Sequence, residues 1–361
     1  MSKFYKLKVI DVVRETADSV SVAFQIPDEF KNIFKYTQGQ YITLKLNLKG
    51  EEIRRSYSIC SSLVEDRELR IAIKMVRNGR GGSIYLNENI KVGDSMEMMP
   101  PMGNFYTDLN SSNRKKYILF AGGSGITPML SILKTTLFVE PQSNIVLFYG
   151  NLNESAIIFK KQLENLVEKY SQRLKIYHIL DQPCIGHDDT FNGIMSVDKT
   201  KMLMGKFVNL ASSNEYFICG PGGMMTNVVA ALQDLKIDKS KVHVEYFVAP
   251  VDTSQIVEQR NTPDNLTFTS KVTIICDGDR TELELGADDT ILEAALGANI
   301  DAPYACQGGS CCTCRAKLIE GKVEMKVNYA LLDSEVDQGY ILTCQSRPLT
   351  PTVIVDYDKG R

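Results

Sequence analysis

The chain has 361 residues, more than one hydrophobic core usually serves, so two or three domains are expected. Hydrophobic residues make up 43% of it and charged residues 24%, the composition of an ordinary globular protein, and no apolar run approaches the roughly 18 residues of a transmembrane helix. The net charge of −3, without any block of lysine and arginine, argues against nucleic acid as a partner.

The cysteines and the N-terminal residues favour the cytoplasm. Four of the nine cysteines lie within residues 306–314 and the others are scattered singly, unlike the disulfide framework of a small secreted domain. Residues 1–9 alternate as in a strand and contain neither an apolar segment nor a small-residue cleavage site. We therefore expect a cytoplasmic protein.

The first domain is expected to be an antiparallel β-barrel over residues 1–108. Short runs rich in β-branched and aromatic residues are separated there by turn residues. The predicted strands are residues 6–13, 20–26, 41–48, 54–60, 69–75 and 95–99.

Two stretches of this barrel suit an anionic, planar cofactor. Arg55 and Tyr57 point to the same face of a strand, so one could bind a phosphate while the other stacks on a ring. Residues 78–83 open a predicted helix, and the bare amides from Gly81 to Ser83 could hold a pyrophosphate. Each pattern also occurs in ordinary exposed strands and turns.

Residues 112–249 are predicted to form an α/β domain with a parallel sheet. The apolar run 117–121 leads directly into a glycine loop, residues 122–128, and then into a helical pattern through residue 133. Thr127 is expected to cap this helix and Pro128 to take its first position, so that the loop amides converge on an anion. Further strands are predicted at 145–149, 174–180 and 216–219, with an amphipathic helix at 159–170.

A second glycine turn follows the last of these strands. Residues 220–224 come directly after Cys219, at the carboxyl edge where doubly wound sheets bind ligands. Two glycine turns at strand ends of one sheet predict a nucleotide site.

The remainder is expected to be a linker, residues 250–268, and a third domain, residues 269–361. The linker is polar and aperiodic. The third domain should contain a hairpin turning at 277–280, a short helix opened by a Thr290–Glu293 capping box, and later strands at 340–344 and 352–355. A small α+β sheet of the ferredoxin (β-grasp) kind suits this order. From residue 271 onward there are 9 basic and 15 acidic residues, so this end is acidic.

Four cysteines of the third domain have the spacing of a cluster site. The pattern is Cys306-x4-Cys311-x2-Cys314, with Cys344 following 30 residues after Cys314. Plant-type ferredoxins hold a 2Fe-2S cluster with this spacing. Zinc is the main alternative, but structural zinc sites usually contain two Cys-x2-4-Cys knuckles, and one half here has a single cysteine.

Two other features of the loop agree with a cluster. Gly308 and Gly309 allow the backbone to wrap closely and to direct N–H groups at sulfur. Cys312 lies between two proposed ligands and is expected to be a spare thiol, since four thiolates already complete the cluster.

Three features of the chain together resemble the ferredoxin-NADP reductase superfamily fused to a C-terminal plant-type ferredoxin. They are the glycine turns, the cysteine set and the strand that carries Arg55-Ser56-Tyr57-Ser58. The resemblance extends over essentially the whole chain. The domain order, with residues 54–60 and 243–247, is most similar to reductase components of oxygenase systems such as phenylacetyl-CoA epoxidase.

The resemblance implies a flavin site on the barrel. Arg55 would bind the flavin pyrophosphate, Tyr57 would stack on the isoalloxazine ring and Ser58 would approach its reactive edge. FAD is expected rather than FMN, because residues 101–105 resemble the turn of FAD-binding members. The residues implied in flavin binding are Arg55, Tyr57, Ser58, Gly81, Gly82, Ser83 and Phe247.

It also implies a dinucleotide site on the α/β domain. The residues implied there are Gly123, Gly125, Thr127, Asp181, Cys219, Gly220 and Pro221. Those expected nearest the hydride transfer are Tyr57, Ser58, Cys219 and Glu245.

The choice between NADH and NADPH depends on Asp181. Members that use NADPH commonly have serine and arginine at this strand end, whereas Leu180-Asp181 resembles NADH-using members. A carboxylate would accept a hydrogen bond from a ribose hydroxyl and repel a 2′-phosphate. NADH is therefore favoured, although Lys160 and Lys161 could still attract a phosphate.

The expected function follows from electron counting. A nicotinamide gives up two electrons at once and a 2Fe-2S cluster accepts one, so a flavin is needed between them. We expect an NAD(P)H-dependent oxidoreductase that passes electrons through FAD and a 2Fe-2S cluster to a separate terminal oxygenase or hydroxylase. The alternatives are a reductase for a desaturase or cytochrome, and a redox-sensing iron-sulfur flavoprotein that signals to a partner.

Overall fold

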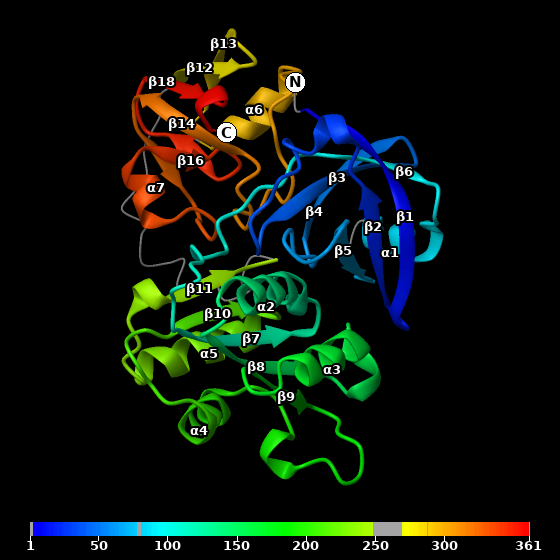
Figure 1. Cartoon of the computed structure of the whole chain (residues 1–361). Coiled ribbons are helices and arrows are strands. Elements are labelled where there is room, and N and C mark those ends of the chain that lie inside the picture. Colours follow the sequence, from blue (N-terminus) through cyan, green and yellow to red (C-terminus); the bar gives the residue numbers. More distant parts are fainter. Residues whose placement is uncertain (1–2, 78–80, 248–268, 287, 361) are drawn as a thin grey trace.

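The computed structural model describes residues 3–77, 81–247, 269–286 and 288–360, which form three sheet-based parts (Figure 1). The predicted linker at 250–268 and the start of the glycine turn, residues 78–80, lie outside the described residues. Among the residues that are described, no helix is long and apolar enough to cross a membrane.

The first part is a six-stranded antiparallel sheet in the order β4-β3-β6-β1-β2-β5. All six predicted strands are present. Ile59, just beyond β4, bridges Ile71 of β5, and this contact joins the two outer strands. The elements are β1 (Tyr5–Thr16), β2 (Ser19–Gln25), β3 (Tyr41–Leu48), β4 (Glu51–Ser58), β5 (Leu69–Lys74), α1 (Gly82–Asn89) and β6 (Ser95–Met98).

The second part is the predicted parallel sheet, in the order β11-β10-β7-β8-β9. The elements are β7 (Lys116–Gly122), α2 (Ile126–Val139), β8 (Asn144–Asn151), α3 (Lys160–Lys169), β9 (Leu174–Leu180), α4 (Val197–Phe207), β10 (Glu215–Cys219), α5 (Gly222–Asp234) and β11 (Val242–Glu245).

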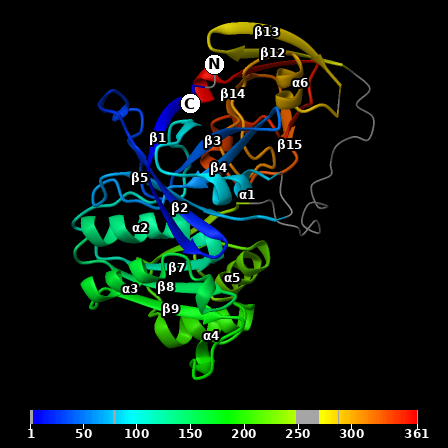
Figure 2. The same ribbon diagram turned by 90° about the vertical axis from the view of Figure 1, so that its right-hand side faces the viewer.

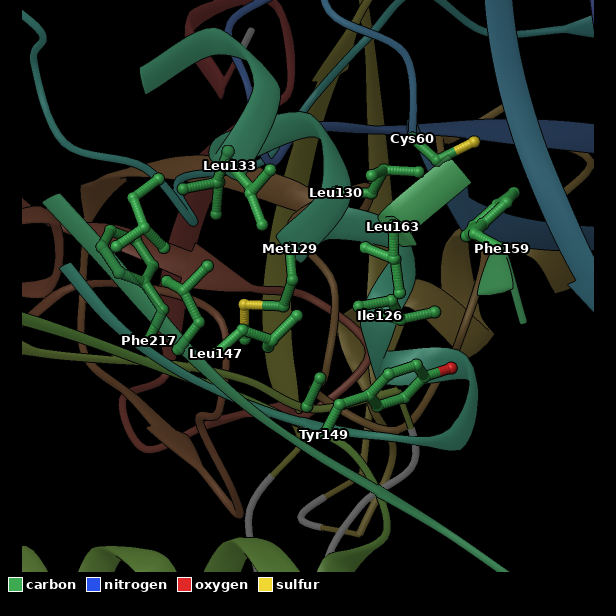
Figure 3. Packing of buried hydrophobic residues seen from close by; sticks show 14 of the residues in the cluster. Cys60, Ile126, Met129, Leu130, Leu133, Leu147, Tyr149, Phe159, Leu163 and Phe217 are labelled. Atoms are coloured by element: carbon green, nitrogen blue, oxygen red, sulfur yellow. The ribbon is translucent and has the colours of Figure 1, made fainter. Parts of the chain in front are cut away.

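Helices cover both faces of this sheet. Successive side chains along its strands point to opposite faces, and both faces are apolar. Leu119 of β7 packs in the cluster that contains α2 and α3, whereas its neighbour Phe120 packs in the cluster that contains α4 and α5. Figure 3 shows the first cluster, in which Met129 and Leu133 of α2 lie over Leu147 of β8. Apolar clusters therefore cover both faces of the parallel sheet.

The predictions that Thr127 caps α2 and that Pro128 takes its first position are wrong, because α2 begins at Ile126 and Pro128 is its third residue. Residues Gly123–Gly125 form a 3-10 turn that continues into α2, and Gly125 takes the capping position. Thr127 lies inside the first turn, where its hydroxyl donates a hydrogen bond to the carbonyl of Ser124 at 3.0 Å. The turn thus passes from strand to helix without a capping side chain.

The third part is a five-stranded sheet in the order β13-β12-β18-β14-β16, with a small β15-β17 pair. The predicted hairpin is present, and Asp277 and Gly278 take φ of 55° and 83°, as a two-residue type I′ turn requires. The Thr290–Glu293 capping box is also present. The elements are β12 (Ser270–Cys276), β13 (Asp279–Leu285), α6 (Ile291–Gly297), β14 (Arg315–Glu320), β15 (Val323–Met325), α7 (Asp333–Asp337), β16 (Tyr340–Leu342), β17 (Ser346–Pro348) and β18 (Thr352–Asp356).

The three parts are in contact with one another. Helix α2 lies between the parallel sheet and the barrel in both views (Figures 1 and 2), and the hydroxyl of Ser131 in α2 donates to the carbonyl of Ser61 in the barrel at 2.6 Å. The third part contacts the barrel through the loop of the predicted cluster ligands, where Tyr41 packs on Ala305 and Cys311.

Candidate functional site

Strand β4 and helix α1 bring the proposed flavin-binding groups together. A Cβ atom at Gly82 would lie 3.8 Å from Cγ of Arg55 and 3.4 Å from Cδ1 of Leu46, so any larger residue would fill the space beside the guanidinium stem. Gly81 has φ of 82°, which favours glycine. A basic side chain next to the amides of a helix N-terminus fits a pyrophosphate group.

The carboxyl end of this strand touches the α/β domain. Ser58, the last residue of β4, donates a hydrogen bond from its hydroxyl to Oε2 of Glu245 at 3.3 Å. Glu245 and Cys219 are register partners on β11 and β10. The structure thus brings together three of the four residues that the sequence placed nearest the hydride transfer.

The ionisation of Glu245 is strongly perturbed. Burial raises the pKa of its carboxyl to about 8, although the hydrogen bond from Ser58 acts in the opposite direction. Burial, helped by the neighbouring Glu245 charge, also raises the pKa of the Cys219 thiol well above its usual value. Cys219 is fully buried, so its side chain is an inert packing group in this structure.

The two glycine turns lie against each other at the carboxyl edge of the parallel sheet. A Cβ atom at Gly125 would lie 2.0 Å from the carbonyl oxygen of Cys219, and one at Gly122 would lie 2.6 Å from Cδ of Pro221. Gly123 takes φ of 49°, which glycine adopts easily. The backbone therefore forms a close cradle at this edge, which fits a dinucleotide pyrophosphate.

Asp181 lies at the carboxyl end of β9, beside an open cleft of about 550 Å³. Its amide continues the β8–β9 ladder by donating to the carbonyl of Asn151 at 3.1 Å, and its side chain is exposed. Asp181 does not line the cleft. The lining residues are Glu15, Asn153, Glu154, Ser155, Ile157, Lys160, Gln182, Pro183 and Cys184.

Lys160 and Glu154 were not predicted as a pair, yet they lie together in this cleft. Lys160 Nζ is 2.5 Å from Glu154 Oε1. In the sequence, the only sign of a charged site here was the basic character of residues 160 and 161. The ion pair with Glu154 could not be predicted, because it depends on the turn after β8.

The four predicted ligand cysteines lie in one region as two pairs. Cys311 Sγ donates to Cys306 Sγ at 3.1 Å, and a second side-chain hydrogen bond links Cys314 and Cys344. Over the described ranges, no three His, Cys, Asp or Glu side chains come together around one metal ion. Two thiol pairs fit the donor set of a two-iron cluster, in which each iron takes two protein ligands.

The local electrostatics favour a thiolate in each pair. The hydrogen bond from Cys311 lowers the pKa of Cys306, and the amide of Gly308, 3.4 Å from its sulfur, adds to this effect against burial. The hydrogen bond from Cys314 likewise lowers the pKa of Cys344. Iron requires thiolates, and amides directed at sulfur are the outer-shell donors of such sites. The residues present therefore fit the cluster.

Cys312 points away from these pairs. Its Sγ lies 3.2 Å from the carbonyl oxygen of Ala330, and burial raises the pKa of its thiol to about 12. That Cys312 is a spare thiol stays a prediction.

Two contacts between the barrel and the cluster domain were not predicted. The hydroxyl of Tyr41 accepts a hydrogen bond from the amide of Cys312 at 3.0 Å. The guanidinium of Arg54 lies 4.2 Å from the ring centre of Tyr304 and forms an ion pair with Asp301 at 3.4 Å. Neither residue is distinguishable in the sequence from a strand residue, because its partner lies more than 240 residues away along the chain.

Three family models match the chain in succession. An oxidoreductase FAD-binding domain matches residues 6–106, an oxidoreductase NAD-binding domain matches residues 119–230, and a 2Fe-2S iron-sulfur cluster binding domain matches residues 274–349. These matches support FAD and a 2Fe-2S cluster as cofactors and do not support the zinc alternative.

Similar proteins span the whole chain. It is 39% identical over 359 residues to a subunit of the 1,2-phenylacetyl-CoA epoxidase of Escherichia coli strain K12, covering 99% of both chains. It is 34% identical to the ferredoxin reductase component of the 3-ketosteroid-9-alpha-monooxygenase of Rhodococcus rhodochrous, over 97% of this chain and 96% of that one. Among solved structures, phthalate dioxygenase reductase aligns with a TM-score of 0.59 and 26% identity over 98% of both chains.

Proposed function

Because this chain belongs to the family of oxygenase reductases that combine FAD-binding, NAD-binding and 2Fe-2S domains, we propose that strands β3 and β4 connect its three redox sites. The protein is an oxidoreductase that passes electrons from NAD(P)H through FAD and a 2Fe-2S cluster to a separate oxygenase component. When bound, these groups supply a hydride donor, a carrier that takes electrons in pairs and releases them singly, and a one-electron acceptor.

One cross-strand pair of residues supports this proposal. Tyr41 of β3 and Ser58 of β4 are register partners. Ser58 donates to Glu245 of the α/β domain, and Tyr41 accepts from Cys312 of the cluster domain. The strand pair therefore lies between the two other domains and touches both.

The roles we propose on the barrel follow from the same strand. Arg55 neutralises the flavin pyrophosphate together with the amides of Gly82 and Ser83, and Tyr57 stacks on the flavin ring. Ser58 directs its hydroxyl toward the reactive edge. Gly81 permits the helix to start at this point, since its φ is positive.

On the α/β side, the backbone is the main binding group. Glu245 is protonated near neutral pH and can hold a proton close to Ser58. Cys219 would line the nicotinamide site when the dinucleotide is bound, and Phe247, 39% exposed, would border the flavin site. The residues proposed for the dinucleotide pyrophosphate are Gly123, Gly125, Thr127, Gly220 and Pro221.

The cluster ligands can be tested one by one. We propose that Cys306, Cys311, Cys314 and Cys344 hold the iron, so serine at any of them should abolish most of the visible cluster absorption and bound iron. Cys312→Ser is the matched control and should retain both. Loss of iron in Cys312→Ser with retention in Cys311→Ser would contradict this ligand register.

The experiment that tests the function compares two acceptors. The purified holoprotein should reduce ferricyanide rapidly with NADH and should also support turnover of an oxygenase. Removing iron by Cys344→Ser should abolish oxygenase support and retain most ferricyanide reduction, because ferricyanide can take electrons at the flavin. A reducible cluster with negligible turnover toward any acceptor would instead favour the redox-sensing alternative.

For the partner, we propose an oxygenase that acts on an aromatic acyl-CoA thioester. The basis is the 39% identity to a subunit of 1,2-phenylacetyl-CoA epoxidase over nearly all of both chains. Reconstitution with the remaining epoxidase subunits should give CoA-dependent product formation. Reconstitution with a 3-ketosteroid oxygenase is the control, since the corresponding reductase is less similar. Equal or better support of the steroid oxygenase would contradict this choice.

For the reductant, we propose NADH. The exposed carboxylate of Asp181 lies at the strand end next to the cleft, where it would repel a 2′-phosphate, while Lys160 is already paired with Glu154. The measurement is kcat/KM for both cofactors with wild type and Asp181→Ser. A wild-type preference for NADPH, or no gain in NADPH use on removal of the carboxylate, would exclude Asp181 from this role.

The location we propose is the cytoplasm. All nine cysteines lie among the described residues, where none of them forms a disulfide and seven are buried. Thiols in such number suit a reducing compartment. Fractionation of the native host, with activity assayed in each fraction, tests this proposal.

A further inference from the structure

Tyr41 of the barrel is seated against the cluster loop. It is 5% exposed, and its ring packs with Ala305 and Cys311, while Met102 and Cys306 lie against the same small cluster. Two of these neighbours are proposed iron ligands. A barrel side chain therefore forms part of the wall around the ligand cysteines.

The hydroxyl of Tyr41 also makes polar contacts with the cluster loop. It accepts the hydrogen bond from the amide of Cys312, the residue between two proposed ligands, at 3.0 Å. Since the oxygen is the acceptor there, its own proton is available to Thr313 Oγ1, which lies at 3.3 Å. Thr313 is 1% exposed, so this pair is shielded from water.

The contact continues into the proposed flavin strand. Thr313 Oγ1 is 3.5 Å from Thr43 Oγ1, and Thr43 Oγ1 is 3.1 Å from the hydroxyl of Ser56 on β4. Tyr41 also faces Ser58 across the β3–β4 ladder. Hydroxyl groups and one strand pairing thus link the cluster loop to the strand that carries Arg55 and Tyr57.

We propose that Tyr41 is a positioning residue that fixes the cluster loop on the barrel and thereby sets the rate at which electrons pass between them. The inference rests on the proposed function. It concerns the hydroxyl group specifically, because the ring alone would fill the same apolar space. Without the hydroxyl, the buried amide of Cys312 loses this acceptor. The loop docked on the barrel is then less stable relative to the undocked loop.

The test replaces the hydroxyl in the full-length holoprotein and includes a matched control. Tyr41→Phe retains the ring. Tyr36→Phe removes the hydroxyl of an equally buried barrel tyrosine, 6% exposed, whose partner is Ser61 at 2.8 Å within the barrel. Tyr41→Phe loses the buried hydrogen bonds to Cys312 and Thr313 of the cluster domain, whereas Tyr36→Phe loses one buried hydrogen bond within the barrel.

Two readouts are measured. Hydrogen exchange of the peptide that spans residues 306–314 should become about tenfold faster in Tyr41→Phe, which corresponds to about 1.4 kcal/mol. In stopped flow with NADH, the rate of cluster reduction divided by the rate of flavin reduction should fall by a similar factor. Tyr36→Phe should leave both the exchange of this peptide and this ratio at the wild-type values.

The outcomes separate this inference from the proposed function. If the wild-type protein does not reduce its cluster with NADH, the proposed function fails, and the exchange readout still reports on Tyr41. If wild type reduces its cluster and Tyr41→Phe matches it in both readouts, the inference is wrong. Equal effects in Tyr36→Phe would also overturn it, as would loss of more than half of the iron in Tyr41→Phe, because Tyr41 would then serve cluster assembly.

Discussion

At the scale of single residues, the carboxyl of Glu245, at the junction of the barrel and the α/β domain, has a strongly raised pKa. It receives one hydrogen bond, from Ser58, and has the fully buried Cys219 beside it on β10. Burial raises its pKa to about 8, so the folded protein keeps Glu245 protonated at pH 7. The site therefore holds a neutral carboxylic acid at this position.

This shift predicts a pH-dependent stability. Between pH 4.5 and about 8, the unfolded chain ionises Glu245 while the folded protein keeps it protonated, so the folded state loses stability as the pH rises. The slope from this group is at most about 1.4 kcal/mol per pH unit. In the flavin-free protein, Glu245→Gln should therefore raise the melting temperature more at pH 8 than at pH 5.

The control for this prediction is Glu168→Gln, which changes an exposed carboxylate on α3. It should shift the melting temperature equally at both pH values. If Glu245→Gln also gave the same shift at pH 5 and pH 8, the raised pKa would be wrong.

At the scale of elements, the close contact of the two glycine turns fixes the nucleotide edge of the sheet. Strands β7 and β10 are parallel neighbours with Ala121 opposite Cys219, so the turns that follow them lie side by side. Gly125 occupies a point where a side chain would collide with the backbone of Cys219. Other glycines of the same turns, such as Gly223, have open space around them.

This difference predicts opposite effects of alanine in the two turns. Gly125→Ala should lower the melting temperature and raise KM for NADH at least tenfold, because one of the two strand ends must move. Gly223→Ala places alanine in the first turn of α5 and should be neutral or stabilising by up to about 1 kcal/mol. Similar behaviour of the two variants would show that the turns are not in contact in solution.

A second element-scale feature is the ion cluster at the start of β10. The side chain of Glu215 is 4% exposed and is bound by Lys115 at 3.0 Å, Lys241 at 3.2 Å and His243 at 3.2 Å. Burial alone would raise its pKa, but these hydrogen bonds outweigh it and hold the pKa at about 2. They join β10 to the starts of β7 and β11.

The lowered pKa fixes the sign of the acid dependence. The stabilisation from Glu215 is complete above pH 4.5, the usual value for this group, and is lost as the pH falls toward 2. Glu215→Gln should cost roughly 1–3 kcal/mol at pH 7 and progressively less below pH 4. Asp234→Asn, which breaks an exposed pair with Lys201, is the control and should cost less than about 1 kcal/mol. A cost for Glu215→Gln that is independent of pH would contradict the network.

At the scale of the whole molecule, polar contacts join the domains. Lys134 of α2, buried in the interface, forms an ion pair with Asp66 of the barrel. On the other side, Asn104 of the barrel donates to Oε2 of Glu335 in the cluster domain at 2.7 Å, and Arg315 pairs with the same carboxylate. Because these contacts involve charged groups, a substitution that changes the charge at one of them can weaken the contact between two domains.

Asn104→Asp would place two carboxylates against each other across the barrel–cluster interface. We expect the flavin-to-cluster electron transfer to slow about tenfold at low ionic strength and to recover partly in 0.5 M salt, because salt screens like-charge repulsion. Asn104→Ala removes the hydrogen bond without adding a charge and should show a smaller effect that salt does not reverse. A salt-independent loss in Asn104→Asp would show that the two carboxylates do not face each other.

Local patterns in the sequence were enough to predict most of the strands and the order of the three domains, but not β11, β14, β15 or β17. These patterns depend only on residues that are close together in the chain. The hairpin at Asp277-Gly278 and the Thr290–Glu293 capping box were predicted for that reason. The family matches confirm the cofactors that these motifs indicated. Two local predictions failed, Thr127 as a cap and Pro128 as the first residue of the helix, because the preceding glycines continued the turn into a helix that begins at Ile126.

The contacts between domains, by contrast, became visible only in the folded molecule. Tyr41 and Arg54 appear in the sequence as ordinary strand residues, yet they contact Cys312 and Tyr304 of the cluster domain. Gly125 and Gly223 appear equivalent, yet of these two only Gly125 has no room for a side chain. Contacts between residues far apart in the chain depend on how separately folded domains pack, and spacing along one segment carries no information about that packing.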